Sequence, residues 1–252
     1  MAKNKNIKGV FGAKIDIGCV RVTNEDQAVA LINSAGNVLL CVCDGMGGHN
    51  KGDYASRLAI DIVSEEFKQH SSFFSPFFVR MWLSRMIKRI NSQIFKESEN
   101  DPIYRNMGTT IVLALFYNDK IFVLNIGDSR AYQVRYKNLK KLSDDQTYVD
   151  YLYNTGKITQ DEMSVSPQRH ILMNALGSFP SVSYSLHIYE NNQKPIVLCS
   201  DGLYNNATEE EIHSALSTSD RVDQKLDTLI EIAKSNGGSD NIAIAYWEPL
   251  KE

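Results

Sequence analysis

The chain has 252 residues, 43% of them hydrophobic, which is enough to bury one substantial core. Its 27 Lys and Arg against 30 Asp and Glu give a formal net charge of -3, so no basic excess indicates binding to nucleic acid or to a membrane surface. The longest apolar run, residues 111–117, is too short to span a bilayer, and no apolar signal-peptide core follows the basic N-terminus. We expect a single-domain cytoplasmic protein.

Short β-type runs recur along the chain. They are rich in Val, Ile, Thr and aromatic residues and are bounded by Gly, Asn or Asp. Their positions are residues 10–17, 28–32, 38–43, 110–117, 121–126, 131–136, 195–199 and 242–247. The short joint at Asn118-Asp119 is a hairpin signal, so antiparallel pairing is expected.

Helical patterns interrupt these strands in two places. Residues 54–69 and 76–96 carry apolar residues at helical spacing. Later, a capping box at Thr208 and an apolar stripe over residues 221–235 predict a second pair of helices, and another capping box starts at Thr159. Strands clustered between paired helices favour packed sheets with helices on their outer faces over an alternating parallel sheet.

Four cysteines lie in or beside the apolar runs, and none has the C-x-x-C spacing of a zinc or redox site. They are Cys19, Cys41, Cys43 and Cys199. We interpret them as small buried hydrophobic residues. Nucleophilic cysteine chemistry is disfavoured.

Acidic residues stand repeatedly where an apolar strand run ends. Three of these positions pair an aspartate with a glycine, and two more lie directly before a strand: Asp44-Gly45, Gly127-Asp128, Asp201-Gly202, Glu25-Asp26 and Asp240-Asn241. A turn explains one such pair, but it does not explain why each pair borders an apolar strand. If these ends meet, the carboxylates need cations to neutralise them. Oxygen-only ligands favour Mg²⁺ or Mn²⁺, and two such ions predict a hydrolase.

The run Asp44-Gly45-Met46-Gly47-Gly48-His49 resembles the signature of the metal-dependent Ser/Thr phosphatases, the PPM or type 2C family, in its bacterial form. Further motifs agree in order, at residues 21–26, 108–110, 127–130, 174–177, 200–203 and 240–241. The resemblance implies an α+β fold, a four-layer α-β-β-α sandwich of two antiparallel sheets flanked by helices. It also implies one catalytic domain over residues 1–252, with a flap at about residues 145–183.

The resemblance assigns the metal ligands position by position. Two Mn²⁺ or Mg²⁺ ions are implied, and the position of Asp128 matches a ligand of a possible third. Asp44 would bridge the two ions, the Gly45 carbonyl would bind the second ion, and Asp201 and Asp240 would hold the first. Glu25 with Asp26 would complete the second site.

Arg21 matches the phosphate clamp of the family, and a guanidinium fork suits two phosphate oxygens. Animal members carry a histidine where Met46 stands, and that histidine is the proposed general acid. In this chain His49 or a water bound to metal are the alternatives for that role.

The implied activity is hydrolysis of phosphoserine and phosphothreonine in proteins by a water that two metal ions activate. A bacterial Ser/Thr kinase would be the partner, and the protein would be a monomer. Three alternatives stay open at this point: a phosphatase for one regulator such as an anti-anti-sigma factor, a pseudophosphatase that only binds phosphoprotein, and a metal-dependent nuclease. The ligands present in the sequence disfavour the pseudophosphatase, and the lack of a basic track disfavours the nuclease.

Overall fold

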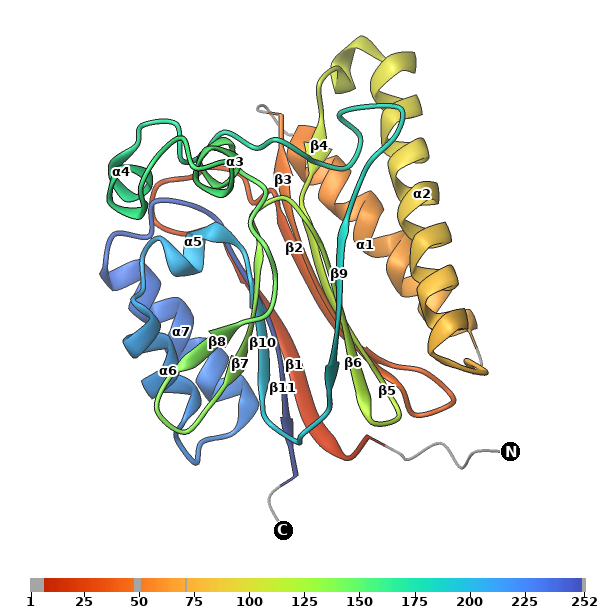
Figure 1. Ribbon diagram of the computed structural model, residues 1–252, viewed down its shortest axis with the longest axis vertical. Helices are drawn as coiled ribbons and strands as arrows, with labels where there is room; N and C mark the ends of the chain where they lie inside the picture. The colour runs from red at the N-terminus through yellow and green to blue at the C-terminus, as the bar shows by residue number, and fades with distance from the viewer. Residues whose placement is uncertain (1–6, 48–50, 71, 251–252) are drawn as a thin grey trace.

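Two antiparallel sheets pack face to face, with helices on both outer faces, in the computed structural model, which describes residues 7–47, 51–70 and 72–250 (Figure 1). The strands are β1 Gly9–Asp16, β2 Asp26–Ile32, β3 Val38–Met46, β4 Gly108–Thr109, β5 Ile111–Tyr117, β6 Lys120–Ile126, β7 Arg130–Val134, β8 Leu139–Lys141, β9 Ser185–Glu190, β10 Ile196–Cys199 and β11 Ile242–Pro249. The helices are α1 Lys51–Gln69, α2 Pro76–Asn100, α3 Tyr148–Asn154, α4 Gln160–Val165, α5 Asp201–Tyr204, α6 Glu209–Leu216 and α7 Val222–Ser235, with one 3-10 turn at Pro102–Tyr104.

The strand orders are β1-β11-β10-β7-β8 in one sheet and β2-β3-β5-β6-β9 in the other, and β4 pairs with β3. Alternation along β3 explains the four layers. Leu39 and Cys41 pack in the core between this sheet and helices α1 and α2, whereas Val38 and Leu40 pack in the core between the two sheets. Because successive side chains of a strand point to opposite faces, one continuous apolar run contributes to two cores. The predicted four-layer α-β-β-α arrangement is confirmed.

All eight predicted strands are present, and the predicted helices are present with boundaries that differ by a few residues at most. Three strands were not predicted. Strands β8 and β9 have polar or half-exposed positions at the sheet edges, and β4 is only two residues long. An edge strand needs no continuous apolar run, so its sequence carries a weaker signal.

The interpretation of the cysteines is right for Cys41, Cys43 and Cys199, which are buried, and wrong for Cys19, which is exposed. Cys19 follows Gly18, whose φ of 78° turns the chain out of β1. Strand β1 ends at Asp16, so Cys19 lies in the turn that follows the strand, where its thiol is exposed. Among the described residues, no helix combines the length and the apolar character needed to cross a membrane.

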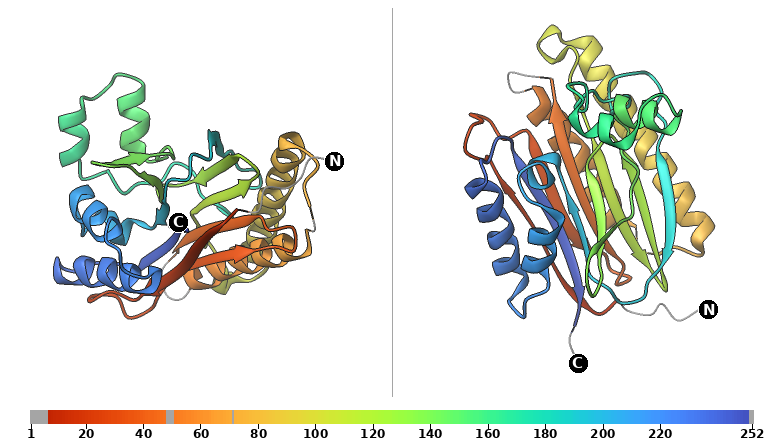
Figure 2. Two further views of the ribbon diagram at one scale, coloured as in Figure 1. Left: turned by 90° about the horizontal axis from the view of Figure 1, so that it is seen from below. Right: turned by 60° about the vertical axis from the view of Figure 1, so that its left-hand side comes forward.

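Helices α3 and α4 lie within the region expected to form the flap and stand beyond the sheets, at the end where β3 and β6 finish (Figures 1 and 2). Both begin with a capping box, at Thr147 and at Thr159. The box predicted at Thr159 is therefore confirmed. This small helical pair overhangs the strand ends that carry the acidic residues.

Candidate active site

The acidic strand ends meet in one cavity of about 270 Å³. Seven of the residues predicted for the site line it: Arg21, Glu25, Asp44, Gly45, Asp128, Asp201 and Asp240. Asp26 pairs with Asp44 across β2 and β3 in the same sheet and is 2% exposed, so it lies buried beside Asp44 and not among the residues that line the cavity. His49, the predicted proton donor, lies outside the described residues.

The end of β3 is held by hydrogen bonds to its neighbour in the sheet. The Thr109 hydroxyl donates to the Asp44 carbonyl at 2.8 Å, and the Thr110 amide donates to the same oxygen at 2.8 Å. The Asp44 amide donates to the Thr110 hydroxyl at 3.0 Å. The motif at residues 108–110 therefore positions the backbone that carries the Asp44 carboxylate.

The glycines of two Asp-Gly pairs allow close backbone approach. A Cβ on Gly45 would lie 2.2 Å from the Gly52 carbonyl oxygen, at the start of α1. A Cβ on Gly202 would lie 1.9 Å from the Asn241 carbonyl oxygen. Gly45 lies within strand β3 and Gly202 within helix α5, so these two pairs do not form turns. They bring the acidic strand ends together.

Asp26 and Asp201 extend the acidic cluster behind and beside Asp44. The Ser200 hydroxyl donates to Asp26 Oδ2 at 2.6 Å, and Asp201 is the first residue of α5. Burial, together with the neighbouring carboxylates, raises the pKa of Asp26, of Asp44 and of Asp201. The protein thus confines carboxylates where repulsion opposes their ionisation.

Asp128 stands in the loop after β6. Burial, with the charge of Asp201, raises the pKa of Asp128 to about 7. The Tyr204 hydroxyl donates to the Asp128 carbonyl at 3.2 Å, and the Arg130 guanidinium lies 3.6 Å from the centre of the Tyr204 ring. Arg130 also pairs with Asp145 at 2.7 Å. These contacts hold the loop that presents the Asp128 carboxylate.

Arg21 and Asp240 meet at the mouth of the cavity, where Arg21 Nη2 donates to Asp240 Oδ2 at 2.8 Å. This hydrogen bond raises the pKa of Arg21. The Asn241 side chain ties down the loop between β1 and β2: its Nδ2 donates to the carbonyls of Ile17 and Thr23, and its Oδ1 accepts from the Glu25 amide at 2.9 Å. Asn241 therefore positions both Arg21 and Glu25.

The donor set fits hard divalent cations. Glu25 Oε1 is buried and has no hydrogen-bond partner among the described residues, and its neighbours in the cavity are carboxylates whose repulsion a cation relieves. In the described part of the chain, no three or more His, Cys, Asp or Glu side chains are placed so that together they could hold a metal ion. Magnesium-type sites usually keep several waters, so this finding is compatible with ions held by carboxylates, the Gly45 carbonyl and water.

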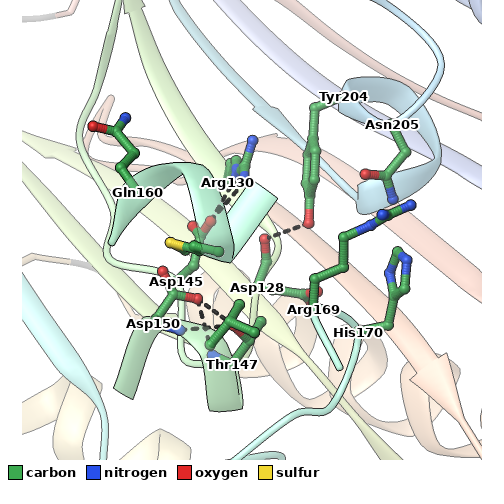
Figure 3. A pocket seen from close by; sticks show the side chains of 12 residues that line it. Asp128, Arg130, Asp145, Thr147, Asp150, Gln160, Arg169, His170, Tyr204 and Asn205 are labelled. Carbon is green, nitrogen blue, oxygen red and sulfur yellow. Dashed lines mark hydrogen bonds and ion pairs between the residues drawn. The ribbon is translucent and has the colours of Figure 1, made fainter. Parts of the chain in front are cut away.

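A second cavity of about 250 Å³ adjoins the first and lies between the helical pair and the sheets (Figure 3). Asp128 and His170 line both cavities. Arg169 and His170 come from the segment after α4. Asp145 comes from the loop before α3, and Asp150 comes from α3 itself. A substrate that entered the acidic cavity would therefore meet side chains of the helical pair.

Three residues at the site were not singled out from the sequence. Thr110 and Asn241 fell within recognised motifs, but only their hydrogen bonds reveal that they position the loop and the strand end. His170 had no sequence signal, because it sits in a polar stretch far from the acidic motifs. Only the folding of that stretch over the strand ends brings its side chain to the cavity.

Buried carboxylates beside an arginine, at the ends of two packed antiparallel sheets, define a hydrolase-type site for divalent cations and an oxyanion. Residues 21–244 match the family model described as Protein phosphatase 2C. The chain therefore belongs to the protein phosphatase 2C family, and the resemblance seen in its motifs is confirmed.

Individual relatives agree with this assignment. The chain is 32% identical to Serine/threonine phosphatase stp of Listeria welshimeri over 236 residues, which cover 93% of this chain and 94% of that protein. Serine/threonine phosphatase Stp1 from Staphylococcus aureus matches in structure with a TM-score of 0.89 and 31% identity, covering 96% of this chain and 95% of that chain. The catalytic domain of the phosphatase PstP, in complex with two manganese ions, matches with a TM-score of 0.82 and 31% identity, covering 95% and 97%.

Removing divalent cations is expected to make stability depend on pH. The folded chain keeps a proton on Asp128 up to about pH 7, whereas the unfolded chain releases it near the ordinary value of 3.8. The folded state then binds more protons, so its stability falls as pH rises between these two values. In EDTA, the melting temperature should fall across this range, and Mn²⁺ should reduce the fall. The variant Asp128→Asn should weaken the dependence; a flat profile in EDTA would contradict the expectation.

Proposed function

We propose that the protein hydrolyses phosphoserine and phosphothreonine in phosphorylated proteins, using water and divalent cations. The observation that carries this proposal is the single cavity that combines the carboxylates of Asp44, Asp201 and Asp240 with the guanidinium of Arg21. The relatives named stp and Stp1 are Ser/Thr phosphatases by name, which supports this substrate class. We treat residues 1–252 as one catalytic domain, with residues 145–183 as its flap.

The proposed ligands follow from chemistry and position. Bound Mn²⁺ or Mg²⁺ would lower the pKa of water and neutralise charge on the phosphoryl group. Asp44 would bridge two ions with help from the Gly45 carbonyl, and Asp201 and Asp240 would hold one of them. The remaining ligands in the proposal are Glu25 and Asp26 for the other ion and Asp128 for a possible third. The manganese-bound PstP structure supports two ions.

Arg21 would hold the substrate phosphate. Its guanidinium has five N–H donors in a planar fork, and the bond to Asp240 Oδ2 uses Nη2. The other N–H groups can donate hydrogen bonds to phosphate oxygens at the cavity mouth. The leaving oxygen also needs a proton, and the proposal of His49 as donor stays a prediction from the sequence.

The flap would contribute to substrate choice. Arg169 and His170 share the second cavity with Asp145 and Asp150, so residues next to the phosphorylated one would meet both charge signs there. A Ser/Thr kinase is the partner that this reaction requires, because it regenerates the phosphorylated substrate. We also propose a monomer in the cytoplasm; the free thiols of the four cysteines are typical of a reducing compartment.

The test is phosphate release from a phosphothreonine peptide with Mn²⁺, with Mg²⁺ and with EDTA, comparing the wild type with Asp240→Asn. We expect release with either metal that is lost in EDTA and strongly reduced in the variant, because Asp240 serves both the metal site and Arg21. A folded wild type that releases no phosphate under any condition, yet binds the peptide, would favour the pseudophosphatase. Release that persists in EDTA would contradict the metal-dependent mechanism.

A further inference from the structure

Three phenylalanines lie exposed where helix α2 begins. The exposed fractions are 85% for Phe74, 63% for Phe77 and 47% for Phe78. Their rings contact one another, with centroids 5.8 Å apart for Phe74 and Phe78 and 5.7 Å apart for Phe77 and Phe78. The adjacent Phe73 is buried in the core, so it anchors this segment without help from the exposed three. Gathered exposed aromatic rings indicate a contact surface.

The same stretch of sequence contains cations and no acidic residue. Residues 67–96 include Lys68, Arg80, Arg85, Lys88, Arg89 and Lys96, and neither Asp nor Glu. The chain as a whole has a net charge of -3, so this segment departs sharply from the average. The expectation that no membrane surface is involved came from the net charge of the whole chain. That average does not show the local excess of positive charge in residues 67–96.

Helical geometry places Arg85, Lys88, Arg89 and Lys96 on the same side of α2 as Phe77 and Phe78, whereas Arg80, two residues after Phe78, lies on another side of the helix. Val79, Leu83, Met86 and Ile90 are buried against the core. Phe78, Arg85, Arg89 and Lys96, at spacings of seven, four and seven residues, lie on the opposite side and form one stripe. Phe77 and Lys88 lie eleven residues apart, about three turns, on a neighbouring stripe of the same side.

Some of this charge is already compensated. Arg89 pairs with Glu66 of α1 at 2.8 Å, and Glu65 lies one residue before Glu66. At the far end of α2, Glu97 and Glu99 follow Lys96. Within the described part of the chain, Arg85 and Lys88 have no ion-pair partner, so their charge is available to an external anion.

We propose that this surface, the basic aromatic face, docks on a lipid bilayer that contains anionic lipids. It comprises Phe74, Phe77, Phe78, Arg85 and Lys88. Phenyl rings partition into the boundary between headgroups and acyl chains, and Lys and Arg bind anionic headgroups above it. Both parts of the face thus match the two layers of a membrane surface. An acidic protein would complement the cations and leave the three rings without a matching layer.

The location of the face is compatible with catalysis at the membrane. In Figure 1 the start of α2 lies at the opposite end of the molecule from β3's end, α3 and α4, where the acidic cavity opens. Docking through the outer side of α2 would leave that cavity accessible to phosphorylated proteins. The effect would be to concentrate the phosphatase near substrates at the membrane, without changing its chemistry.

The test is sedimentation of the full chain with vesicles of phosphatidylcholine alone and of an equal mixture of phosphatidylcholine and phosphatidylglycerol. We expect binding to the mixed vesicles, weakened by high salt. The variant Arg85→Glu with Lys88→Glu should lose at least about fivefold in binding for each cation removed. The combined variant Phe74→Ser, Phe77→Ser and Phe78→Ser should bind the mixed vesicles more than about tenfold more weakly, because it removes all three rings that would enter the membrane.

Matched controls lie on the β7–β8 hairpin, far from α2. Tyr136→Ser removes one aromatic ring that is 91% exposed, and Lys137→Glu with Lys140→Glu makes the same change in net charge as the test pair. Both controls should bind as the wild type does. All variants should keep the melting temperature and the hydrolysis of a small phosphate ester, because the face is remote from the cavity.

Three outcomes would overturn the proposal. The first is a folded wild type that binds neither vesicle. The second is binding that both test variants retain. The third is a wild type that dimerises in light scattering, loses the dimer in the phenylalanine variant and ignores vesicles, which would assign the face to a second copy of the chain. Failure of catalysis alone would leave vesicle binding unchanged, so the two proposals are tested separately.

Discussion

Replacing Asp44 by asparagine is expected to reduce phosphate release by at least about a thousandfold while the chain stays folded. Asp44 lines the cavity with Asp128, Asp201 and Asp240 and pairs with Asp26 across the sheet. Asparagine keeps the size of the side chain but removes the charge that would bridge two cations. The hydrogen bonds that hold this position use the Asp44 backbone, so the substitution does not remove them.

The measurement is kcat with Mn²⁺, together with the melting temperature in EDTA. Without metal, the variant should be at least as stable as the wild type, because one source of repulsion is gone. Asp119→Asn, at the exposed turn between β5 and β6, is the matched control and should keep full activity. Activity near the wild-type level in Asp44→Asn would exclude the two-metal mechanism.

Replacing Lys225 by alanine is expected to lower the free energy of unfolding by about 3–5 kcal/mol. The Lys225 side chain is 1% exposed, and its Nζ lies 2.6 Å from Glu248 Oε2. The Tyr246 hydroxyl donates to the same oxygen at 2.9 Å. Without the lysine, a mostly buried carboxylate between α7 and β11 loses its counterion. That cost exceeds the loss of a typical surface ion pair.

Denaturant unfolding of the metal-loaded protein would measure this effect. The double variant Lys225→Met with Glu248→Gln removes both charges and keeps the volumes similar, so it should recover most of the lost stability. Lys14→Ala is the control for an exposed pair, since Lys14 contacts Asp227 on the surface, and it should change stability by less than about 1 kcal/mol. An equally small change in Lys225→Ala would show that the buried pair is not needed for stability.

The strands that form the centre of the two sheets were predictable because they are apolar on both faces. β5 and β6 are buried almost throughout, and such runs have few alternatives to a central strand. β9 is different: its residues are half-exposed, and it becomes a strand by pairing with β6. That pairing depends on a segment more than fifty residues away in sequence, which local patterns do not report.

The acidic residues of the site were predictable as a set, because each stands beside an apolar strand and within a family motif. Their supporting residues were not. Asn241 acts through three hydrogen bonds to the loop after β1, over two hundred residues earlier in the chain. His170 reaches the cavity through the folding of the segment after α4.

The sequence by itself therefore determined the class of chemistry, since the types and order of Asp44, Asp201, Asp240 and Arg21 restrict which ions and substrates the site can hold. The tertiary structure alone decided how Gly45 and Gly202 permit close backbone contact. It alone also decided that Arg85 and Lys88 of α2 share a surface with three exposed rings. The physical reason is that residue chemistry is local, whereas burial, repulsion and surface charge depend on which distant segments the fold places together.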